Sequence, residues 1–375
     1  MIGAHRAARA VIDLDALRHN LRLLAGNVGT SELWMVVKAN AYGHGAVACA
    51  STALSAGVVG FCVALTQEAL ELRAAGINAP IMVLSEQPYA DVPLLVENRI
   101  ICVVYNAAYI EALAAESSRR SVRTGVHLKV DTGMHRVGVP PEQAARLAVD
   151  IVHHNGLELQ GVMTHLAAAD DPSHPVTERQ LVNFQRVIRE IRGVVPEFRH
   201  VHVANSAAAL RSLLPECTMV RVGIAAYGLQ PSSTVAALVA GLQPVMKLFS
   251  RISHVQRVPA GEGVSYGQRV ILDRDTTIAT LPIGYADGIP RRSWETGVRI
   301  LVGGVPRRIL GSVTMDQLMV DCGDDRVSVG DEAVLFGTQD GCRIRVEEWA
   351  AAHDTITYEI VTAVSARVPR DYIGA

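Results

Sequence analysis

Between residue 30 and about residue 230, short apolar or β-branched runs alternate with longer stretches rich in Ala, Leu, Glu and Arg. The longer stretches, such as TQEALELRAAG and PPEQAARLAVDIVHH, have the composition and spacing of helices. The short runs are LWMVVKAN, VVGFCVAL, APIMVLSE, RIICVVYN, TGVHLKVDTG, LQGVMTHLA, RHVHVANS and TMVRVGIAAYG. Eight strands that alternate with helices predict an α/β fold, an eight-stranded (β/α) barrel of the TIM type. An open doubly wound sheet is the alternative.

Polar residues fall late in these runs. In a barrel, the carboxyl ends of all the strands open onto one face, and active sites lie on that face. Side chains that are far apart in the sequence would therefore converge there. They are Lys38, Ser85, Asn106, Lys129, Asp131, His165, Asn205 and Arg221.

After about residue 240 the pattern changes to short alternating segments rich in Gly, Pro and Val, such as VMKLFSRISHVQRVPAGEGVSYG. Short strands separated by Gly/Pro turns predict a mainly β domain. Because 375 residues are too many for one ordinary core, we expect two domains. We place the barrel at residues 1–240 and the β-strand-rich domain at residues 241–375.

Charge and composition exclude several classes of partner. The formal net charge of −2 provides no basic excess to attract nucleic acid or an acidic membrane, so a small molecule or a second copy of the chain is expected. The N-terminal stretch soon meets Asp13 and Asp15, unlike a signal peptide, and no apolar run of about 18 residues predicts a membrane span. Six dispersed cysteines without a Cys-x-x-Cys pair favour a reducing, cytoplasmic setting.

The segment WMVVKANAYGHG places Lys38 inside an apolar run, where an unpaired ammonium is costly. Lys38 could be a lysine whose ammonium reaches water at the rim of the barrel. It could instead be a Schiff-base lysine, which loses its charge by condensing with a carbonyl group. The AYGHG segment that follows supplies a tyrosine hydroxyl and a flexible backbone suited to gripping a phosphate or substrate.

The last two runs carry the signs of a phosphate site. HVANSAA places Asn205 and Ser206 at one strand end, and MVRVGIAAYG places Arg221, Gly223 and Ile224 at the next. Barrels commonly bind phosphate at the loops after their seventh and eighth strands, through backbone N–H groups. Pyridoxal 5'-phosphate would satisfy both demands, with an aldehyde for Lys38 and a phosphate for this cradle.

Eight motifs are similar in sequence and order to those of one family: VVKANAYGHG, HLKVDTGMHRVG, THLAAAD, ANSAA, VRVGIAAYG, VSYG, IGYADG and TMDQ. The whole chain resembles the bacterial alanine racemases, pyridoxal-phosphate enzymes that combine a barrel with a β-domain. The resemblance implies that Lys38 holds the cofactor and is one catalytic base. It implies that Tyr266, supplied by the β-domain of a partner subunit, is the other base. Arg221 would face the pyridine nitrogen, and His165 would link it towards Tyr266.

The resemblance also assigns the remaining site residues. The cofactor would be held by Tyr42, His165, Asn205, Ser206, Gly223, Ile224 and Tyr358, and the substrate carboxylate by Arg136 and the backbone at Met315. Lys129 would be carbamylated and would orient Arg136, while Tyr285 and Tyr358 would narrow the entrance. Asp316 would either orient the surroundings of Tyr266 or cap a turn. The sequence departs from the family pattern at Ser312 and Thr314. These departures affect the expected geometry of the entrance and therefore the range of substrates that could enter.

Other polar residues have simpler interpretations. THLAAADDPSH contains two histidines and two aspartates without a metal-ligand spacing, so we expect a solvated loop and no metal site. Asp287 is interpreted as a β-turn acid and His127 as a packed barrel residue.

The expected activity is interconversion of L-alanine and D-alanine by a cytoplasmic homodimer with shared active sites, supplying D-alanine for peptidoglycan. The alternative is a racemase of the same fold that acts on serine, lysine or several amino acids. A barrel decarboxylase shares the lysine, but Arg221 is the wrong partner for its pyridine nitrogen. Non-catalytic cofactor carriers are single barrels, without the second domain.

Overall fold

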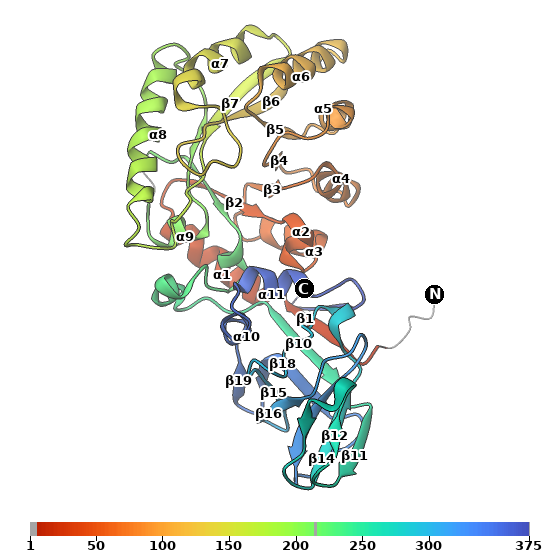
Figure 1. Ribbon diagram of the computed structural model, residues 1–375. Coiled ribbons are helices and arrows are strands. Elements are labelled where there is room, and N and C mark those ends of the chain that lie inside the picture. The colour runs from red at the N-terminus through yellow and green to blue at the C-terminus, as the bar shows by residue number, and fades with distance from the viewer. Residues whose placement is uncertain (1–5, 214–215, 375) are drawn as a thin grey trace. The chain divides into compact units, whose positions relative to one another are not determined.

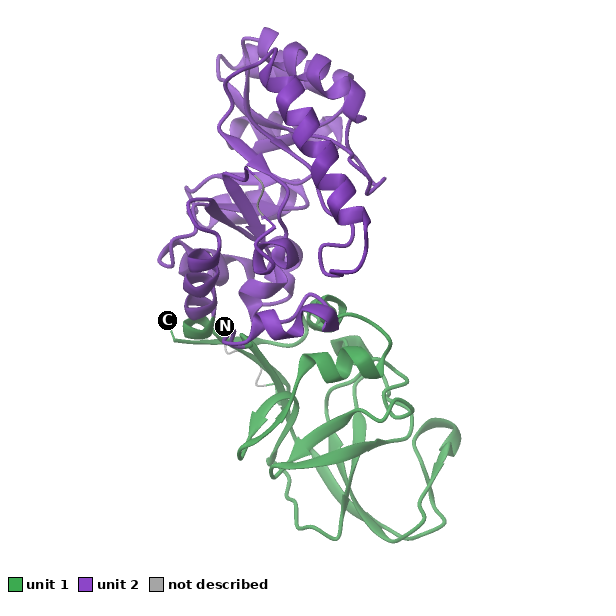
Figure 2. Cartoon of the chain, turned by 90° about the vertical axis from the view of Figure 1, so that its left-hand side faces the viewer, with its two compact units in different colours: residues 1–16, 244–375 green, residues 17–243 purple. Residues whose placement is uncertain are grey.

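The computed structural model describes residues 6–213 and 216–374. Residues 1–5, which begin the N-terminal stretch that is unlike a signal peptide, lie outside this range. The chain divides into two compact units (Figure 2). One unit is Leu17–Gln243, and the other comprises the described residues of Met1–Ala16 and Pro244–Ala375.

The first unit contains eight parallel strands in the order β8-β7-β6-β5-β4-β3-β2-β9, which confirms the predicted barrel (Figure 1). Each of the eight apolar runs supplies one strand. The ring is completed between β9 and β8, where the Thr218 N–H donates to the Val201 carbonyl at 3.0 Å and the Arg221 N–H to the Ala204 carbonyl at 3.1 Å. The strands are β2 (Glu32–Val36), β3 (Gly60–Val63), β4 (Ile81–Val83), β5 (Ile101–Val104), β6 (Thr124–Lys129), β7 (Leu157–Met163), β8 (His200–His202) and β9 (Met219–Val222).

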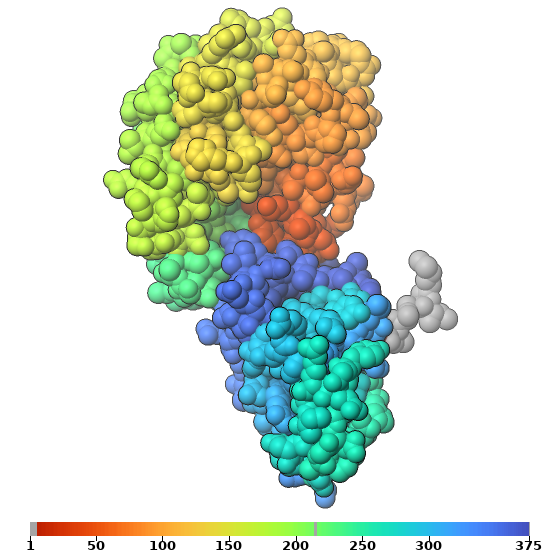
Figure 3. Space-filling view, viewed as in Figure 1, coloured from red at the N-terminus to blue at the C-terminus, as the bar shows by residue number. Residues whose placement is uncertain are grey.

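Helices connect these strands and cover the outside of the barrel (Figure 1), and Figure 3 shows the same view with all atoms filled. In α7, for example, Ala144, Leu147, Ala148 and Ile151 are buried, the spacing of one apolar helical face. The helices are α1 (Leu14–Asn27), α2 (Lys38–Tyr42), α3 (Ala46–Leu54), α4 (Thr66–Ala74), α5 (Val92–Glu97), α6 (Ala107–Arg119), α7 (Pro141–His153), α8 (Val176–Arg192) and α9 (Ser206–Leu210), with 3₁₀ turns η1 (Tyr89–Asp91), η2 (Ile224–Tyr227) and η3 (Ser233–Val239). No helix in the described ranges combines the length and apolar character needed to cross a membrane.

The second unit is mainly β, as predicted. Its large sheet has the order β11-β14-β17-β16-β15-β18-β10-β1-β20, and β19 pairs with β18, while β12 and β13 form a separate ladder. The elements are β1 (Arg9–Asp13), β10 (Met246–Arg251), β11 (His254–Val258), β12 (Gly263–Val264), η4 (Tyr266–Gln268), β13 (Val270–Ile271), β14 (Thr276–Leu281), η5 (Tyr285–Asp287), β15 (Arg299–Val302), β16 (Val305–Leu310), β17 (Leu318–Gly323), β18 (Glu332–Gln339), β19 (Cys342–Ile344), α10 (Val346–Ala352), α11 (Thr357–Ala363) and β20 (Arg370–Ile373).

The observed division of the chain differs from the one expected at residues 1–240 and 241–375, because the N-terminal strand β1 belongs to the second unit. It pairs antiparallel with β10 and parallel with β20, so it lies inside the sheet. Ala10 and Ile12 alternate with more exposed neighbours and are fully buried. The physical reason is that RAVID has the period-two pattern of a strand with one buried face. The strands that pair with it, β10 and β20, both come from the second unit.

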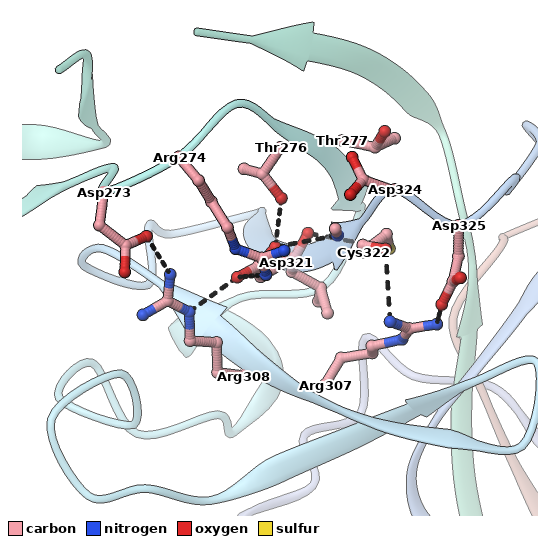
Figure 4. A network of polar contacts seen from close by, with 12 residues as sticks. Asp273, Arg274, Thr276, Thr277, Arg307, Arg308, Asp321, Cys322, Asp324 and Asp325 are labelled. Atoms are coloured by element: carbon pink, nitrogen blue, oxygen red, sulfur yellow. Dashed lines mark hydrogen bonds and ion pairs between the residues drawn. The ribbon is translucent and has the colours of Figure 1, made fainter. Parts of the chain in front are cut away.

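A polar network joins β14, β16 and β17 of the same unit (Figure 4). Asp321 on β17 is 6 % exposed, and its carboxylate accepts hydrogen bonds from Thr276, from Arg308 at 2.8 Å and from the Gly323 N–H at 3.0 Å. Burial alone would raise the pKa of this carboxyl, but the hydrogen bonds from Thr276 and Arg308 hold it below its usual value. The ionised Asp321 therefore ties three strands together.

Candidate active site

Lys38 lies one residue beyond the carboxyl end of β2, after Val37, and begins the short helix α2. The four residues after it, from Ala39 to Tyr42, have φ values of 51° to 54°. This region favours glycine, and other residues pay about 1–2 kcal/mol each to occupy it. The segment expected to be a flexible loop is therefore a left-handed helical turn. Strained backbone of this kind is typical of functional sites.

Two side chains hold this turn. The Glu68 carboxylate on α4 accepts a hydrogen bond from the Ala39 N–H at 2.6 Å and another from the Ala64 N–H at 2.8 Å. The Asn40 side chain accepts from the Ala46 N–H at 2.8 Å, at the start of α3. The unfavourable backbone is thus fixed from both sides, and the position of Lys38 is fixed with it.

Arg221 on β9 is the most connected side chain at the mouth of the barrel. It is 3 % exposed, and its Nη2 donates to the carbonyls of Thr164 at 3.0 Å and Val203 at 3.2 Å. The same nitrogen lies 3.2 Å from Nδ1 of His165, and its Nη1 lies 2.5 Å from Nδ1 of His202. These acceptors come from β8 and from the segments that follow β7 and β8, so the guanidinium is held in one orientation.

The hydrogen bonds continue from Arg221 into the barrel interior. Nε2 of His202 lies 2.7 Å from Nδ1 of His127 on β6, and both rings are fully buried. The ring of His200 lies next, with its centroid 5.3 Å from that of His127. Nε2 of His200 is 3.1 Å from the Glu32 carboxylate at the start of β2. His127 is therefore packed, as expected, but it is also part of a polar column.

A cradle of small and hydroxyl-bearing residues forms between the loops that follow β2, β8 and β9. The Ser206 hydroxyl accepts hydrogen bonds from the N–H groups of Gly223 at 2.8 Å and Ala225 at 3.3 Å. A Cβ atom at Gly223 would lie 2.5 Å from the Tyr42 hydroxyl, so only glycine allows this approach. Asn205 caps α9 by accepting from the Ala208 N–H at 3.0 Å, and Ile224 begins η2.

Lys129 ends β6, and the loop that follows carries Arg136. The Asp131 carboxylate accepts from the N–H groups of Gly133, Met134 and His135, each at 3.0 Å, which ties the loop to its own start. The loop returns to the strand where the Val139 N–H donates to the Lys129 carbonyl at 2.8 Å. Arg136 is exposed on this fixed loop, whereas Lys129 is only 5 % exposed.

The charges at the mouth are predominantly positive, and they act on one another. Burial, followed by the charge of Arg136, lowers the pKa of Lys38. Burial and the charges of Arg221 and Arg136 lower the pKa of Lys129 to about 8. Burial and the charge of Arg221 hold the pKa of His165 well below its usual value, so this imidazole is neutral near pH 7. The mouth thus favours uncharged amines and would attract an anion.

The other candidate residues lie in the second unit. Tyr266 begins η4 and is 71 % exposed, between Ser265 and Gly267, which have φ values of 63° and 74°. A pocket of about 590 Å³ in this unit is lined by Tyr266, Gln256, Thr314, Gln317 and Met319 among others. The strained backbone presents the tyrosine side chain to the outside of its own unit.

The segments of Met315 and Tyr285 adjoin each other. The Tyr285 N–H donates to the Thr314 carbonyl and the Ala286 N–H to the Met315 carbonyl, both at 3.0 Å. Tyr285 is 41 % exposed, and Tyr358 is half-buried in α11.

Two acids of this unit have arginine partners. Asp316 pairs with Arg367 at 2.6 Å. Asp287 is more than a turn acid, because it is fully buried and pairs with Arg6 at 2.6 Å. Its carboxylate also accepts from the Gly284 N–H at 2.9 Å, which is the turn contact expected of it.

Sequence reasoning missed Glu68, His202 and His200. Glu68 lies one helix away from the turn it holds, so no local pattern marks it. The alternation HVHVAN places His200 and His202 on the same face of a strand, and this pattern was the signal that could have identified them. Within the described residues, no group of three or more His, Cys, Asp or Glu side chains could hold a metal ion.

Comparison with known proteins agrees with this arrangement. Residues 12–231 match the family model of the alanine racemase N-terminal domain, and residues 245–372 match that of the C-terminal domain. The chain belongs to the alanine racemase family. An alanine racemase of Thermobifida fusca is 41 % identical over 375 residues, which covers 98 % of each chain.

Solved alanine racemase structures share the fold over the full length. The enzyme from D-cycloserine-producing Streptomyces lavendulae aligns with a TM-score of 0.93 at 39 % identity, covering 100 % of this chain and 98 % of the other. The Bacillus anthracis alanine racemase with bound L-Ala-P aligns with a TM-score of 0.93 at 35 % identity, covering 99 % and 96 % of the two chains.

Proposed function

We propose that this chain interconverts L-alanine and D-alanine with pyridoxal 5'-phosphate as cofactor. The observation that carries the proposal is the mouth of the barrel, where a half-buried lysine after β2, a fixed arginine on β9 and an anion cradle lie at the same end of the strands. Lys38 has a lowered pKa, which favours the free amine that can condense with an aldehyde. The same fold acting on serine, lysine or several amino acids is the alternative.

The residues present fit the cofactor. The cradle of Tyr42, Ser206 and Gly223 offers two hydroxyls beside a position that a Cβ would fill, and the Gly223 N–H holds the Ser206 hydroxyl in place. Asn205 fixes the start of α9 next to it, Ile224 continues the cradle, and Tyr358 is proposed to complete it. When bound, pyridoxal phosphate supplies an aldehyde and a ring that withdraws electrons from the substrate α-carbon.

Arg221 sets the character of the reaction. Arginine has donors only and does not give up its proton near neutral pH. Placed against the pyridine nitrogen of the cofactor, it could not keep that nitrogen protonated as a carboxylate would, so the bound cofactor would withdraw electrons less strongly. Transamination and decarboxylation, which need strong withdrawal, would then be less favoured than reprotonation. His165 is proposed to continue a chain of hydrogen bonds from Arg221 towards Tyr266.

Racemisation requires proton removal from one face of the α-carbon and proton return to the other. We assign Lys38 to one face and Tyr266 to the other. A tyrosine has an ordinary pKa of about 10, so it needs nearby positive charge to act as a base. We propose that Tyr266 reaches the site from the partner subunit of a homodimer, with Tyr285 and Tyr358 narrowing the entrance.

Arg136 and the backbone at Met315 are proposed to bind the substrate carboxylate, with Asp316 supporting that segment. We propose that Lys129 is carbamylated and orients Arg136. A pKa of about 8 leaves Lys129 partly as a free amine at neutral pH, and this amine adds to CO₂ with release of one proton. Intact mass measured in neutral and acidic buffer tests the assignment: the mass of one CO₂ should be present and lost in acid. An unmodified mass in neutral, bicarbonate-containing buffer would contradict it.

The proposed function is tested by incubating the purified protein and pyridoxal phosphate with L-alanine in D₂O. Proton NMR and chiral chromatography should show D-alanine with deuterium at the α-carbon. Serine and lysine, run in parallel, rank the substrates. Exchange without inversion would mean that a single base works, and no exchange with any amino acid despite a bound cofactor would refute the proposal.

Shared active sites are tested by mixing two inactive variants, Lys38→Ala and Tyr266→Phe. If each site takes its lysine and its tyrosine from different subunits, every mixed dimer contains one intact site. Statistical exchange should then restore about a quarter of the sites. No recovery after verified subunit exchange would show that each chain completes its own site.

Supply of D-alanine for peptidoglycan in the cytoplasm is the proposed cellular role. A strain that lacks this activity should need external D-alanine for growth.

A further inference from the structure

The polar column inside the barrel connects the site to the opposite end of the strands. We propose that His127, His200 and Glu32 are positioning residues that fix the tautomer of His202 and thereby the orientation of Arg221. The inference rests on the proposed function, because Arg221 is assigned there to the cofactor. It adds three residues that touch neither substrate nor cofactor.

The direction of each hydrogen bond follows from the arginine. Arg221 can only donate, so Nδ1 of His202, 2.5 Å away, must accept. A neutral imidazole has one donor and one acceptor, so His202 carries its proton on Nε2. That proton is donated to Nδ1 of His127 at 2.7 Å, which places the proton of His127 on its own Nε2. The orientation of both rings is therefore determined.

Both imidazoles must be neutral for this arrangement. Burial, together with neighbouring positive charge that includes Arg221, holds the pKa values of His127 and His202 well below their usual range. A second proton on His202 would also point an N–H at the guanidinium and break the contact. Neutral rings are thus required both by geometry and by charge.

The lower end of the column is fixed by a carboxylate. Burial alone would raise the pKa of the Glu32 carboxyl, but the hydrogen bonds from Trp34 and Arg199 help to hold it below its usual value, so Glu32 is ionised and can only accept. His200 therefore donates from Nε2 at 3.1 Å, and its Nδ1 is left as an acceptor. Glu32, Arg199 and His200 line a cavity of about 800 Å³ at the amino-terminal ends of the strands.

Two buried atoms remain in the middle of the column. Neither Nε2 of His127, a donor, nor Nδ1 of His200, an acceptor, has a hydrogen-bond partner among the described residues. One ordered water between them would satisfy both, and buried polar atoms are usually satisfied in this way. The column would then run without a break from Arg221 to Glu32.

Gly161 provides the space for the two rings. In the strand register it lies between His127 on β6 and His200 on β8. A Cβ at this position would lie 2.8 Å from Nδ1 of His127 and 2.9 Å from Cβ of His200. A glycine in the interior of a strand weakens the strand, so its presence here is explained by the close approach of its neighbours.

The column excludes the second arrangement of His202. If His127 could not accept, the proton of His202 could move to Nδ1, where it would face the donors of Arg221. The guanidinium would then lose one of its acceptors and turn. A small displacement of a group that faces the reacting atoms can change a rate by about a hundredfold.

The test compares His127→Asn with His127→Leu in the holoenzyme. Both side chains are close to histidine in size, but only Asn keeps an acceptor near the position of Nδ1. We expect the Leu variant to lose about tenfold to a hundredfold in kcat and to shift the absorption band of the bound cofactor. The Asn variant should stay within a few-fold of the wild type. Equal behaviour of the two variants, with both folded, would overturn the proposal.

A second measurement does not depend on activity or on the folding of a variant. ¹⁵N NMR of histidine-labelled wild-type protein should show His127 and His202 as neutral rings protonated on Nε2. An Nδ1-protonated or doubly protonated His202 would overturn the proposal even in an active enzyme. If the tautomers are as expected but the wild type neither binds pyridoxal phosphate nor exchanges the α-proton of any amino acid, the proposed function fails and the geometric assignment stands.

Discussion

At the scale of single residues, Arg221 shows how one side chain is fixed by backbone and rings together. Its guanidinium reaches two carbonyls and two imidazoles from a nearly completely buried position. Burying a cation is costly unless its donors are satisfied, and here each acceptor is supplied by the ends of strands that the barrel brings together. The planar, forked shape of arginine is therefore part of the requirement.

Replacing Arg221 by lysine tests this requirement. The ammonium keeps the charge but cannot reach all four acceptors at once, so we expect kcat to fall about tenfold to a hundredfold. Racemisation rates in both directions and the cofactor spectrum provide the measurement. Arg192→Lys is the matched control, since Arg192 is a surface residue paired with Glu216 and should tolerate the change. Full activity of Arg221→Lys would show that charge alone is needed.

At the scale of elements, the left-handed turn of α2 is a short segment whose backbone is maintained against its own preference. Its residues are Ala, Asn, Ala and Tyr, and none of them is glycine. The cost is offset by Glu68, which accepts from the first N–H of the turn, and by Asn40, which bonds to the start of α3. The turn places Lys38 and Tyr42 at opposite ends of one rigid unit.

Ala39→Gly should therefore stabilise the protein. Glycine removes the cost of positive φ, about 1–2 kcal/mol, and part of this gain is lost to the greater freedom of the unfolded chain. We expect the free energy of unfolding to rise by about 0.5–1 kcal/mol in denaturant titrations. Ala115→Gly, at an exposed position inside α6, is the same substitution in a right-handed helix and should cost about 1 kcal/mol. The same sign for both variants would contradict the argument.

The network around Asp321 predicts that the free energy of unfolding depends on pH. Since the pKa of Asp321 is lowered by folding, its contribution is present above the unfolded value of about 3.9 and is lost as the pH falls through the lower, folded value. Asp321→Asn should lower the free energy of unfolding by about 2 kcal/mol at pH 7, and the difference should shrink in acid. Urea titrations from neutral to acidic pH measure it.

Asp324→Asn is the control for that experiment. Asp324 pairs with Arg257 at 2.6 Å, but its side chain is 78 % exposed. The variant should change stability by less than about 1 kcal/mol at any pH. A larger loss in Asp324→Asn than in Asp321→Asn would show that burial does not decide the strength of these pairs.

At the scale of the whole molecule, the order of elements in the second unit departs from the order of the sequence. β1 lies between β10 and β20, so a strand from the beginning of the chain is an interior strand of a sheet built from its end. The Ala10 N–H donates to the Pro369 carbonyl at 2.9 Å, and Arg9 pairs with Asp371 at 3.0 Å. Each unit has its own sheet.

Ala10→Pro should destabilise the second unit selectively. Proline removes the N–H that bonds to Pro369 and is not tolerated in an interior strand. We expect a loss of about 3 kcal/mol or more and faster proteolytic cleavage after residue 244, with the barrel unit still resistant. Ala10→Gly keeps the N–H and should cost only about 1 kcal/mol. Equal protease resistance of wild type and Ala10→Pro would show that β1 is dispensable.

The sequence predicted what depends on local periodicity. Eight apolar runs separated by helical stretches indicated the barrel, and the late polar residues indicated the face where Lys38, Lys129 and Arg221 meet. The membership of β1 could not be predicted, because RAVID indicates a strand but not its partners. The column of His127 and His200 depends on register across β6, β7 and β8, which no single run contains. The left-handed turn was hidden because its residues are not glycines.

The position of β1 has a consequence for how the protein is made. During translation β1 leaves the ribosome first, but neither of its neighbours exists until the entire barrel has been synthesised. β20 follows much later in the chain than β10. The first strand must therefore wait unpaired, with Ala10 and Ile12 uncovered, while a complete domain folds behind it. A ribosome that stalls after the barrel has emerged but before β10 has emerged would hold a folded barrel and an unpaired β1 that is open to the wrong partner.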